Sequence, residues 1–511
     1  MLKKTLLTLS LLSALAQAAT IKIAYDADPV SLDPMQQLSA DTIQMANLVF
    51  DGLVRYDHEN KILPRLAERW ERVNETTTRF YLRQGVKFHS GNPFTADDVV
   101  FSFNRAMSAP NFKSVIAPFE KIEKIDDFTV DIVEKKPYPL TLNMLTNLFI
   151  MDSKFYSGND DKGQPKDQIA LKGGSFAENN PSGTGAFKIE SREQGIKVVF
   201  VKNPDFYEKT GNVDRIELSA IKENATRISA LLSGDVDFIF PVPPNDIARV
   251  KEDKRLNLHT MPSSRIIFFY MDENLQPAFK DKRVRLAFNY AVNNQGIVDK
   301  IMKEGATAAG QSSPPGYLGH VPELTPRYDL DKAKALMKEA GFADGFEVDL
   351  IAPNDRYVND AKIAEAVAAQ LAKINVKANL TTMPRAQYFV YRDECKAAVN
   401  MLGIAPITSD SIDYATYIVH SKDAEKGLGQ YNCSYKNPEL DALIEQAISE
   451  LDEDKRKALL QEISRIQYED APLIQMHWQN LHWAYTKRFS NFPEVVNSEN
   501  IPKWDLLQVK E

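Results

Sequence analysis

The chain has 511 residues, 43% hydrophobic and 26% charged, and its 62 basic residues are outnumbered by 70 acidic ones. This composition predicts a globular protein with apolar material for two or three domains. The acidic balance argues against nucleic acid and anionic lipid as partners.

The first 18 residues have the pattern of a cleavable secretory leader. Lys3 and Lys4 precede an apolar run over residues 5–15, and Ala16-Gln17-Ala18 supplies a small-x-small cleavage site. The run is too short to cross about 30 Å of hydrocarbon, which disfavours a membrane anchor. No cysteine follows the small residues, so we expect a soluble protein of the periplasm and no lipoprotein. Without the two lysines the mature chain carries 60 basic and 70 acidic residues, a formal charge of −10.

The next 85 or so residues predict a small α/β unit. Residues 20–25 alternate as a strand and lead into a turn-rich loop ending Ser31-Leu32-Asp33-Pro34. A second strand is predicted over residues 78–83, and glycines and Pro93 then supply turns. Thr95 with Asp98 three residues later forms a capping-box variant that predicts the start of a helix.

The exact residue string of this stretch is more informative about the protein's family than its hydrophobic periodicity. The string LAERWE, followed by F-x-LR-x-GVKFH-x-G-x-PFTADDVVFSF-x-R over residues 80–105, resembles the signature of the extracellular solute-binding proteins of the peptide/nickel family, the capture subunits of ABC importers. The loop before Pro34 and residues 180–189 continue the resemblance. It implies an α/β fold of two lobes, of the type II periplasmic binding protein kind, with an extra subdomain in the first lobe and a ligand cleft between the lobes.

The rest of the chain divides accordingly. Periodicity predicts helices over residues 281–292, 330–341, 361–374, 438–451 and 454–469, and strands over 196–201, 348–352 and 376–382. The predicted organisation is a signal peptide at 1–18, a first lobe from 19–60, 181–270 and 484–511, a subdomain at 61–180, and a second lobe at 271–483.

The usual catalytic motifs are missing. The sequence has no G-x-S-x-G, no H-E-x-x-H and no complete phosphate-binding loop, and its seven histidines are scattered. His477 and His482 are five residues apart, which suits neither one helix face nor one strand face. We therefore predict no enzymatic activity and no cofactor.

The family resemblance implies which residues contact the ligand. Asp410 stands where peptide-binding members carry the carboxylate that pairs with a peptide's ammonium end, and Arg356 stands where an arginine holds a carboxylate. The chain departs from the pattern with Ile404 in place of a tryptophan and Ser411 in place of a proline. The remaining predicted contacts follow these motifs or the loop after Pro34: Met35, Gln36, Met401 and Tyr414.

Two ligand classes remain open. Asp410 and Arg356 favour a short peptide, because opposite charges suit the two ends of a zwitterion. The departures around Asp410, with His477 as a possible imidazole donor, favour nickel held in a small chelate, for example with histidine. A periplasmic chaperone or interaction protein is the alternative from another class.

Two further expectations concern covalent structure and partners. Cys395 and Cys433 are the only cysteines, and an exported pair is predicted to form a disulfide. The resemblance implies a monomer that delivers its small ligand to an inner-membrane permease and ATPase.

Overall fold

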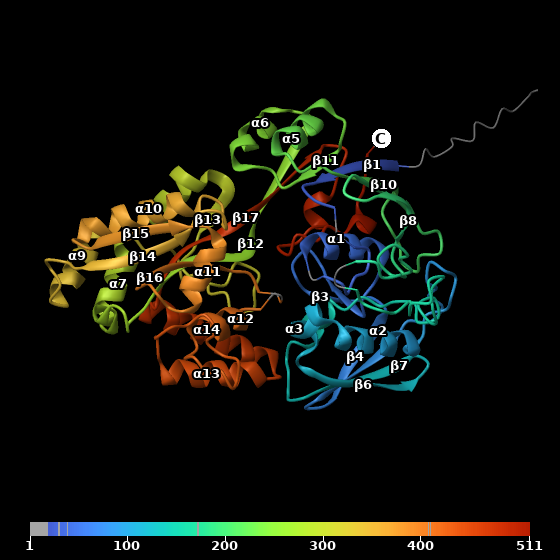
Figure 1. The fold of residues 1–511 in the computed structure, drawn as a ribbon, viewed down its shortest axis with the longest axis horizontal. Helices are drawn as coiled ribbons and strands as arrows, with labels where there is room; N and C mark the ends of the chain where they lie inside the picture. The colour runs from blue at the N-terminus through green and yellow to red at the C-terminus, as the bar shows by residue number, and fades with distance from the viewer. Residues whose placement is uncertain are drawn as a thin grey trace, which may run out of the picture.

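The structure is a computed structural model that describes residues 19–28, 31–37, 39–170, 173–406, 408 and 410–510. The predicted leader lies outside these residues. The chain forms two lobes side by side, with the N-terminal third on one side and residues of the later half on the other (Figure 1). None of the described helices has the length and apolar character needed to span a membrane.

One sheet runs through both lobes. Within the described residues eleven strands form it, in the order β15-β14-β16-β12-β17-β11-β1-β10-β9-β8, with β13 paired to β17. Their bounds are β1 Ala19–Tyr25, β8 Phe187–Glu193, β9 Lys197–Lys202, β10 Val213–Ala220, β11 Phe238–Phe240, β12 Leu256–Met271, β13 Ala306–Ala308, β14 Glu347–Pro353, β15 Lys377–Met383, β16 Val399–Ile404 and β17 Leu473–Thr486.

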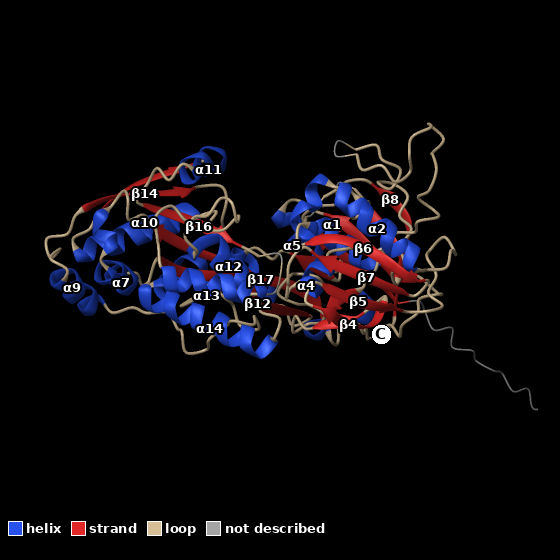
Figure 2. Cartoon of the chain, turned by 90° about the horizontal axis from the view of Figure 1, so that it is seen from below, coloured by secondary structure: helices blue, strands red, loops and turns tan. Residues whose placement is uncertain are grey.

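The two long strands β12 and β17 join the lobes (Figure 2). They pair antiparallel from Leu256 opposite Thr486 to Tyr270 opposite Leu473, and the register shifts between Pro262 and Ile266. Before the shift β17 also pairs with β11 of the first lobe, and after it β12 pairs with β16 of the second. Both strands therefore belong to both lobes, and the predicted boundaries at residues 270 and 483 remain a proposal.

A smaller sheet lies beside the first lobe. It has the order β4-β5-β7-β6, with β4 Ala67–Asn74, β5 Thr77–Leu82, β6 Phe119–Asp126 and β7 Thr129–Glu134, next to a two-stranded ribbon of β2 Val54–Tyr56 and β3 Ile62–Pro64. Helix α2 (Ala96–Ser108) packs on this sheet and opens with the predicted capping box, in which the backbone N–H of Thr95 donates to Asp98 at 2.8 Å.

The other helices cover the sheets and link the strands. They are α1 Ala40–Val49, α3 Lys113–Ile116, α4 Thr141–Leu145, α5 Asn224–Ser233, α6 Ile247–Glu252, α7 Lys282–Ala291, α8 Asn294–Ile297, α9 Leu330–Glu339, α10 Asp360–Leu371, α11 Arg385–Asp393, α12 Ile412–Tyr414, α13 Pro438–Ser449 and α14 Glu453–Asp470. In the second lobe α7, α9 and α10 share one hydrophobic core with β14 and β16. A second core joins α12, α13 and α14 to β12. The sheet of this lobe is thus buried between two layers of helices.

The predicted disulfide is present. Cys395 and Cys433 are bonded, with 5.9 Å between their Cα atoms, and tie the end of α11 to the loop before α13.

Candidate ligand cleft

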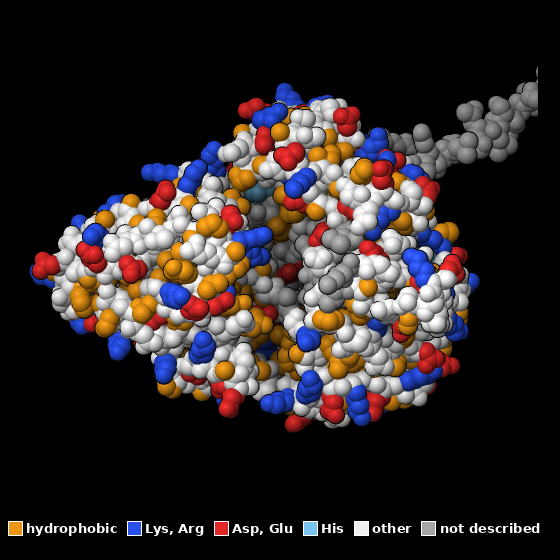
Figure 3. All heavy atoms as spheres, in the orientation of Figure 1, with side chains coloured by type: hydrophobic (Ala, Val, Ile, Leu, Met, Phe, Trp, Pro, Cys, Tyr) orange, Lys and Arg blue, Asp and Glu red, His pale blue; other side chains and the backbone are white. Residues whose placement is uncertain are grey.

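A cavity lies where the two lobes meet. It has a volume of about 210 Å³, where a single water needs roughly 10–15 Å³ of such space. The surface is visibly hollowed between the lobes, with basic side chains on the rim of the second lobe (Figure 3). The cavity is lined by Ser39, Ile43, Asn47, Arg55, Tyr56, Thr146, Asn147, Pro406, Glu499, Ile501 and Lys503.

The first lobe supplies most of this wall. Helix α1 presents Ile43 and Asn47, and the C-terminal segment runs past it with Lys503. Burial, followed by the positive charge of Arg55, lowers the pKa of the Lys503 amine to about 7. Arg55 is itself held by Asp505, with 2.9 Å between Nη1 and Oδ2. This wall therefore places ionisable side chains, with the charge of Arg55 already paired, next to apolar surface.

Several described contacts join the lobes, including an ion pair between Lys251 and Glu304. Tyr317 of the second lobe donates a hydrogen bond from Oη to Oε1 of Glu499 at 2.7 Å. Leu140, which precedes α4 in the first lobe, is buried in the second lobe's cluster around α12–α14, and Tyr138 packs against the same cluster. The backbone carbonyl of Tyr138 accepts from Arg72 of β4 at 2.8 Å, so this loop is fixed to the small sheet.

Two arginines lie together on the second lobe. Arg356 is exposed after β14 and stands 5.2 Å from the ring of Tyr357, whose Oη accepts from the backbone N–H of Gly403 on β16 at 2.9 Å. Arg265 lies half-buried on β12, next to Ile266, which is opposite Ile404 on β16. Burial, and then repulsion by Arg356, lower the pKa of the Arg265 guanidinium.

Asp410 is fully engaged inside the second lobe. Its carboxylate receives both terminal nitrogens of Arg456 on α14, at 2.8 Å from Nη2 to Oδ1, and both side chains are 3% exposed. Oδ1 also accepts from the backbone N–H of Ile412 at 2.9 Å. The role of Asp410 as partner of a ligand ammonium remains a prediction, and the structure shows a second role in joining α12 to α14.

None of the predicted ligand contacts, Arg356 and Asp410 included, is among the residues that line the cavity, and the other four are buried. Met35 and Met401 are both 0% exposed and belong to the cores of the first and second lobes respectively. Gln36 donates from Nε2 to the carbonyl of Ala170 at 2.8 Å. Tyr414 donates its hydroxyl to the carbonyl of Ser264. Their roles as ligand contacts stay predictions.

His477 is completely buried on β17. Burial lowers its pKa to about 3, and among the described residues neither ring nitrogen has a hydrogen-bond partner. In the part of the chain that the structure describes, the sole group of His, Cys, Asp and Glu side chains close enough to share a metal is Asp272 with Cys395 and Cys433, and these cysteines are bonded to each other. A protein-supplied nickel cage thus finds no support in these residues.

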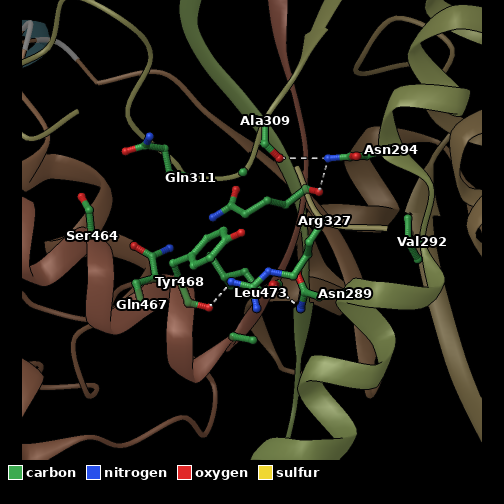
Figure 4. Close-up of a pocket in the computed structure, with 13 residues that line it drawn as sticks. Asn289, Val292, Asn294, Ala309, Gln311, Arg327, Ser464, Gln467, Tyr468 and Leu473 are labelled. Atoms are coloured by element: carbon green, nitrogen blue, oxygen red, sulfur yellow. Dashed lines mark hydrogen bonds between the residues drawn. The ribbon is translucent and has the colours of Figure 1, made fainter. Parts of the chain in front are cut away.

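A second, smaller pocket lies within the second lobe, away from the interlobe cavity. It holds about 20 Å³, near the room that one water needs, and its walls combine polar side chains such as Arg327 and Asn294 with apolar ones such as Leu473. Arg327 stacks over Tyr468 at 3.5 Å from the ring centre and donates to its backbone carbonyl, and Asn294 donates to the carbonyl of Ala309 (Figure 4). These bonds join α14 to the loop before α9 and α8 to the residue after β13, and they indicate a structural pocket.

A two-lobed α/β chain with a cavity between the lobes has the architecture of a hinge-closing ligand receptor. Residues 61–426 match the family described as bacterial extracellular solute-binding proteins, family 5. The chain belongs to that family.

Individual relatives cover most of the chain. The dipeptide-binding protein of Escherichia coli (strain K12) is 28% identical over 494 residues, 90% of each chain. Heme-binding protein A of Haemophilus influenzae is 29% identical over 455 residues, 83% of this chain and 81% of its own. The structure of HbpA2 from Haemophilus parasuis superposes with a TM-score of 0.88 at 26% identity and covers 96% of this chain and 100% of its own.

Several cleft residues carry no motif in the sequence. Glu499 and Lys503 belong to a C-terminal segment that returns to the first lobe, and Arg55 lies in a three-residue strand. Arg265 had one available signal: it is a charged residue directly before the apolar run Ile266 to Met271 of a buried strand.

Proposed function

We propose that this protein is the periplasmic capture subunit of an ABC importer and that it binds a short peptide in the cavity between its lobes. The cavity carries the proposal, because residues of both lobes line it and a ligand there favours their closure. Family membership and the likeness to a dipeptide-binding protein support it. The bound form passes its peptide, unaltered, to a membrane permease, and the protein acts as a monomer without catalysing a reaction.

Arg356 is the residue that we assign to the peptide's terminal carboxylate. Its guanidinium is exposed and has no ion-pair partner among the described residues, so it keeps a planar pair of donors for a carboxylate. Asp410 remains the proposed partner of the ammonium end, although Arg456 and the backbone N–H of Ile412 occupy its carboxylate in this structure.

Isothermal titration calorimetry with a di- and tripeptide panel tests the proposal, with nickel plus free histidine as the competing ligand. We expect heat from peptides. Arg356→Ala should weaken binding roughly 10- to 150-fold, the value of a lost charged hydrogen bond of about 1.5–3 kcal/mol. Arg283→Ala is the matched control, since Arg283 is an exposed arginine of the same lobe that pairs only with Asp281 and a backbone carbonyl of α9.

Two results would count against this function. If nickel with histidine gives binding heat and no peptide does, the ligand would be a nickel chelate and not a peptide. Cleavage of the bound peptide, seen by mass spectrometry of the mixture after incubation and retained in a second, independent preparation, would contradict the absence of catalysis.

A further inference from the structure

The second lobe presents two cations near the cleft and no described anion that pairs with them. Neither guanidinium, of Arg265 or of Arg356, has a hydrogen-bond or ion-pair partner in the described part of the chain. They flank Tyr357, whose hydroxyl is fixed to the backbone of Gly403. The Tyr357 hydroxyl therefore ties the loop that carries Arg356 to β16, the strand that pairs with β12, on which Arg265 lies.

Arg265 is not among the residues that line the cavity, but two chains of contacts lead from it to the cavity wall. Ile266, its neighbour, is opposite Ile404, and Pro406, two residues farther along that strand's exit, lines the cavity. The preceding residue, Ser264, accepts through its carbonyl from Tyr414, whose ring lies 6.4 Å from that of Tyr317. Tyr317 in turn bonds to Glu499 in the cavity wall. Two separate paths thus connect Arg265 to the cavity.

The nearby carboxylates are already occupied. Glu499 accepts from Tyr317, and Asp410 is paired with Arg456. A half-buried guanidinium beside a second one is unfavourable unless an anion compensates both, because burial removes the water that would otherwise solvate the charge. A single terminal carboxylate neutralises only one of the two.

Resting on the proposed function, we propose that Arg265 is a specificity-determining residue that holds a second carboxylate, and that the preferred ligands are short acidic peptides. One arginine binds the peptide's terminal carboxylate and the other binds an acidic side chain on the same or the neighbouring residue. Guanidinium groups suit both, since each offers a planar pair of N–H donors to a carboxylate.

The first experiment compares Ala-Glu with Ala-Gln, which match in shape and differ in one charge, by calorimetry. The protein should bind Ala-Glu at least about tenfold more tightly, the value of one charged hydrogen bond. Arg265→Gln should weaken Ala-Glu roughly tenfold more than Ala-Gln, Arg265→Lys should restore part of the preference, and Arg356→Gln should weaken both peptides. Arg283→Gln is the control. Equal affinities for the two peptides would overturn the inference and leave the peptide function intact.

A second arm does not need a peptide. Glutarate carries two carboxylates and glutaramate one, and a ligand that binds the folded state raises the melting temperature. Glutarate should raise the Tm more than glutaramate, and Arg265→Gln should abolish the difference. If glutarate stabilises the protein but calorimetry detects no binding of any peptide, the peptide function would be overturned and the second carboxylate site would stand. Equal shifts from the two acids, or an Arg265→Gln response like that of the unaltered protein, would overturn the second carboxylate site.

Folding of the variant is a separate check. Because Arg265→Gln removes a half-buried charge that no described residue compensates, the ligand-free Tm should stay the same or rise. A large fall in the ligand-free Tm would show that Arg265 is a structural residue, and would count against its role as a ligand contact.

Discussion

Asp410 illustrates how a residue matched to a family position can serve the fold at the same time. Its pairing with Arg456 joins two segments separated by 46 residues, and both partners are shielded from water. Arg456 also donates from Nε to the carbonyl of Ala447 at 3.0 Å, so it links α13 and α14 as well. A loss of binding in an Asp410 variant therefore does not by itself demonstrate ligand contact.

The first residue-scale prediction separates these roles. Asp410→Ala should lower the free energy of unfolding by about 3–5 kcal/mol, because Arg456 is left buried without its partner. The double variant Asp410→Leu with Arg456→Met should recover much of that loss, since it removes both charges. Urea unfolding followed by circular dichroism measures both. A single variant as stable as the unaltered protein would show that the pair is not structurally important.

A second residue-scale prediction concerns Asp413. It is buried in the same region and accepts from Thr408 at 2.8 Å, and burial raises its pKa to about 7 from an ordinary value of 3.8. The folded state thus holds this proton at pH values where the unfolded chain has lost it. Stability from this group is complete below about pH 4 and falls as pH rises towards 7, at up to 1.4 kcal/mol per pH unit.

Asp413→Asn should remove that slope, because the amide cannot ionise. Urea unfolding from pH 4 to 8 should show similar stabilities at pH 4, with the variant the more stable by pH 8 by on the order of 4 kcal/mol. Parallel curves for the two proteins across this range would rule out Asp413 as the titrating group.

At the scale of elements, the sequence predicted the helix ends that are set by residues close together in the chain. Thr95 and Asp98 lie three residues apart and cap α2 as expected. Gly341 is the last residue of the helix predicted over 330–341, which corresponds to α9. Its φ is +84°, a backbone conformation that glycine adopts without strain. These signals operate within one or two turns of chain, so a sequence displays them directly.

The pairing of β12 with β17 is a feature that local sequence signals do not predict. More than 200 residues separate these strands, and neither carries a pattern that specifies its partner. The candidate site depends on such pairings, because Arg265 approaches Tyr357 only through β16 and β14. The family resemblance identified Arg356, which lies within a motif. Glu499 and Lys503 come to line the cleft, and Arg265 to lie near Arg356, only after folding.

On the scale of the whole molecule, a loop of the first lobe reaches into a hydrophobic core of the second lobe. The loop of Tyr138 and Leu140 is held rigidly to the first lobe, since Arg72 binds both the Tyr138 carbonyl and Glu134. Its apolar side chains nonetheless pack into the second lobe's core. The loop therefore connects the two lobes, in addition to β12 and β17, and limits how far the lobes can separate.

Shortening the Leu140 side chain of this loop should change the shape of the protein more than its stability. Leu140→Ala removes an interlobe side chain that is 5% exposed, whereas Leu145→Ala removes one that is 0% exposed and lies in the first lobe's own core. Buried Leu→Ala changes typically cost about 2–5 kcal/mol. Small-angle scattering of the ligand-free protein should therefore show a larger radius of gyration for Leu140→Ala, and urea unfolding should show the larger loss of stability for Leu145→Ala. Equal radii for the two variants would mean that the Leu140 contact does not set the angle between the lobes.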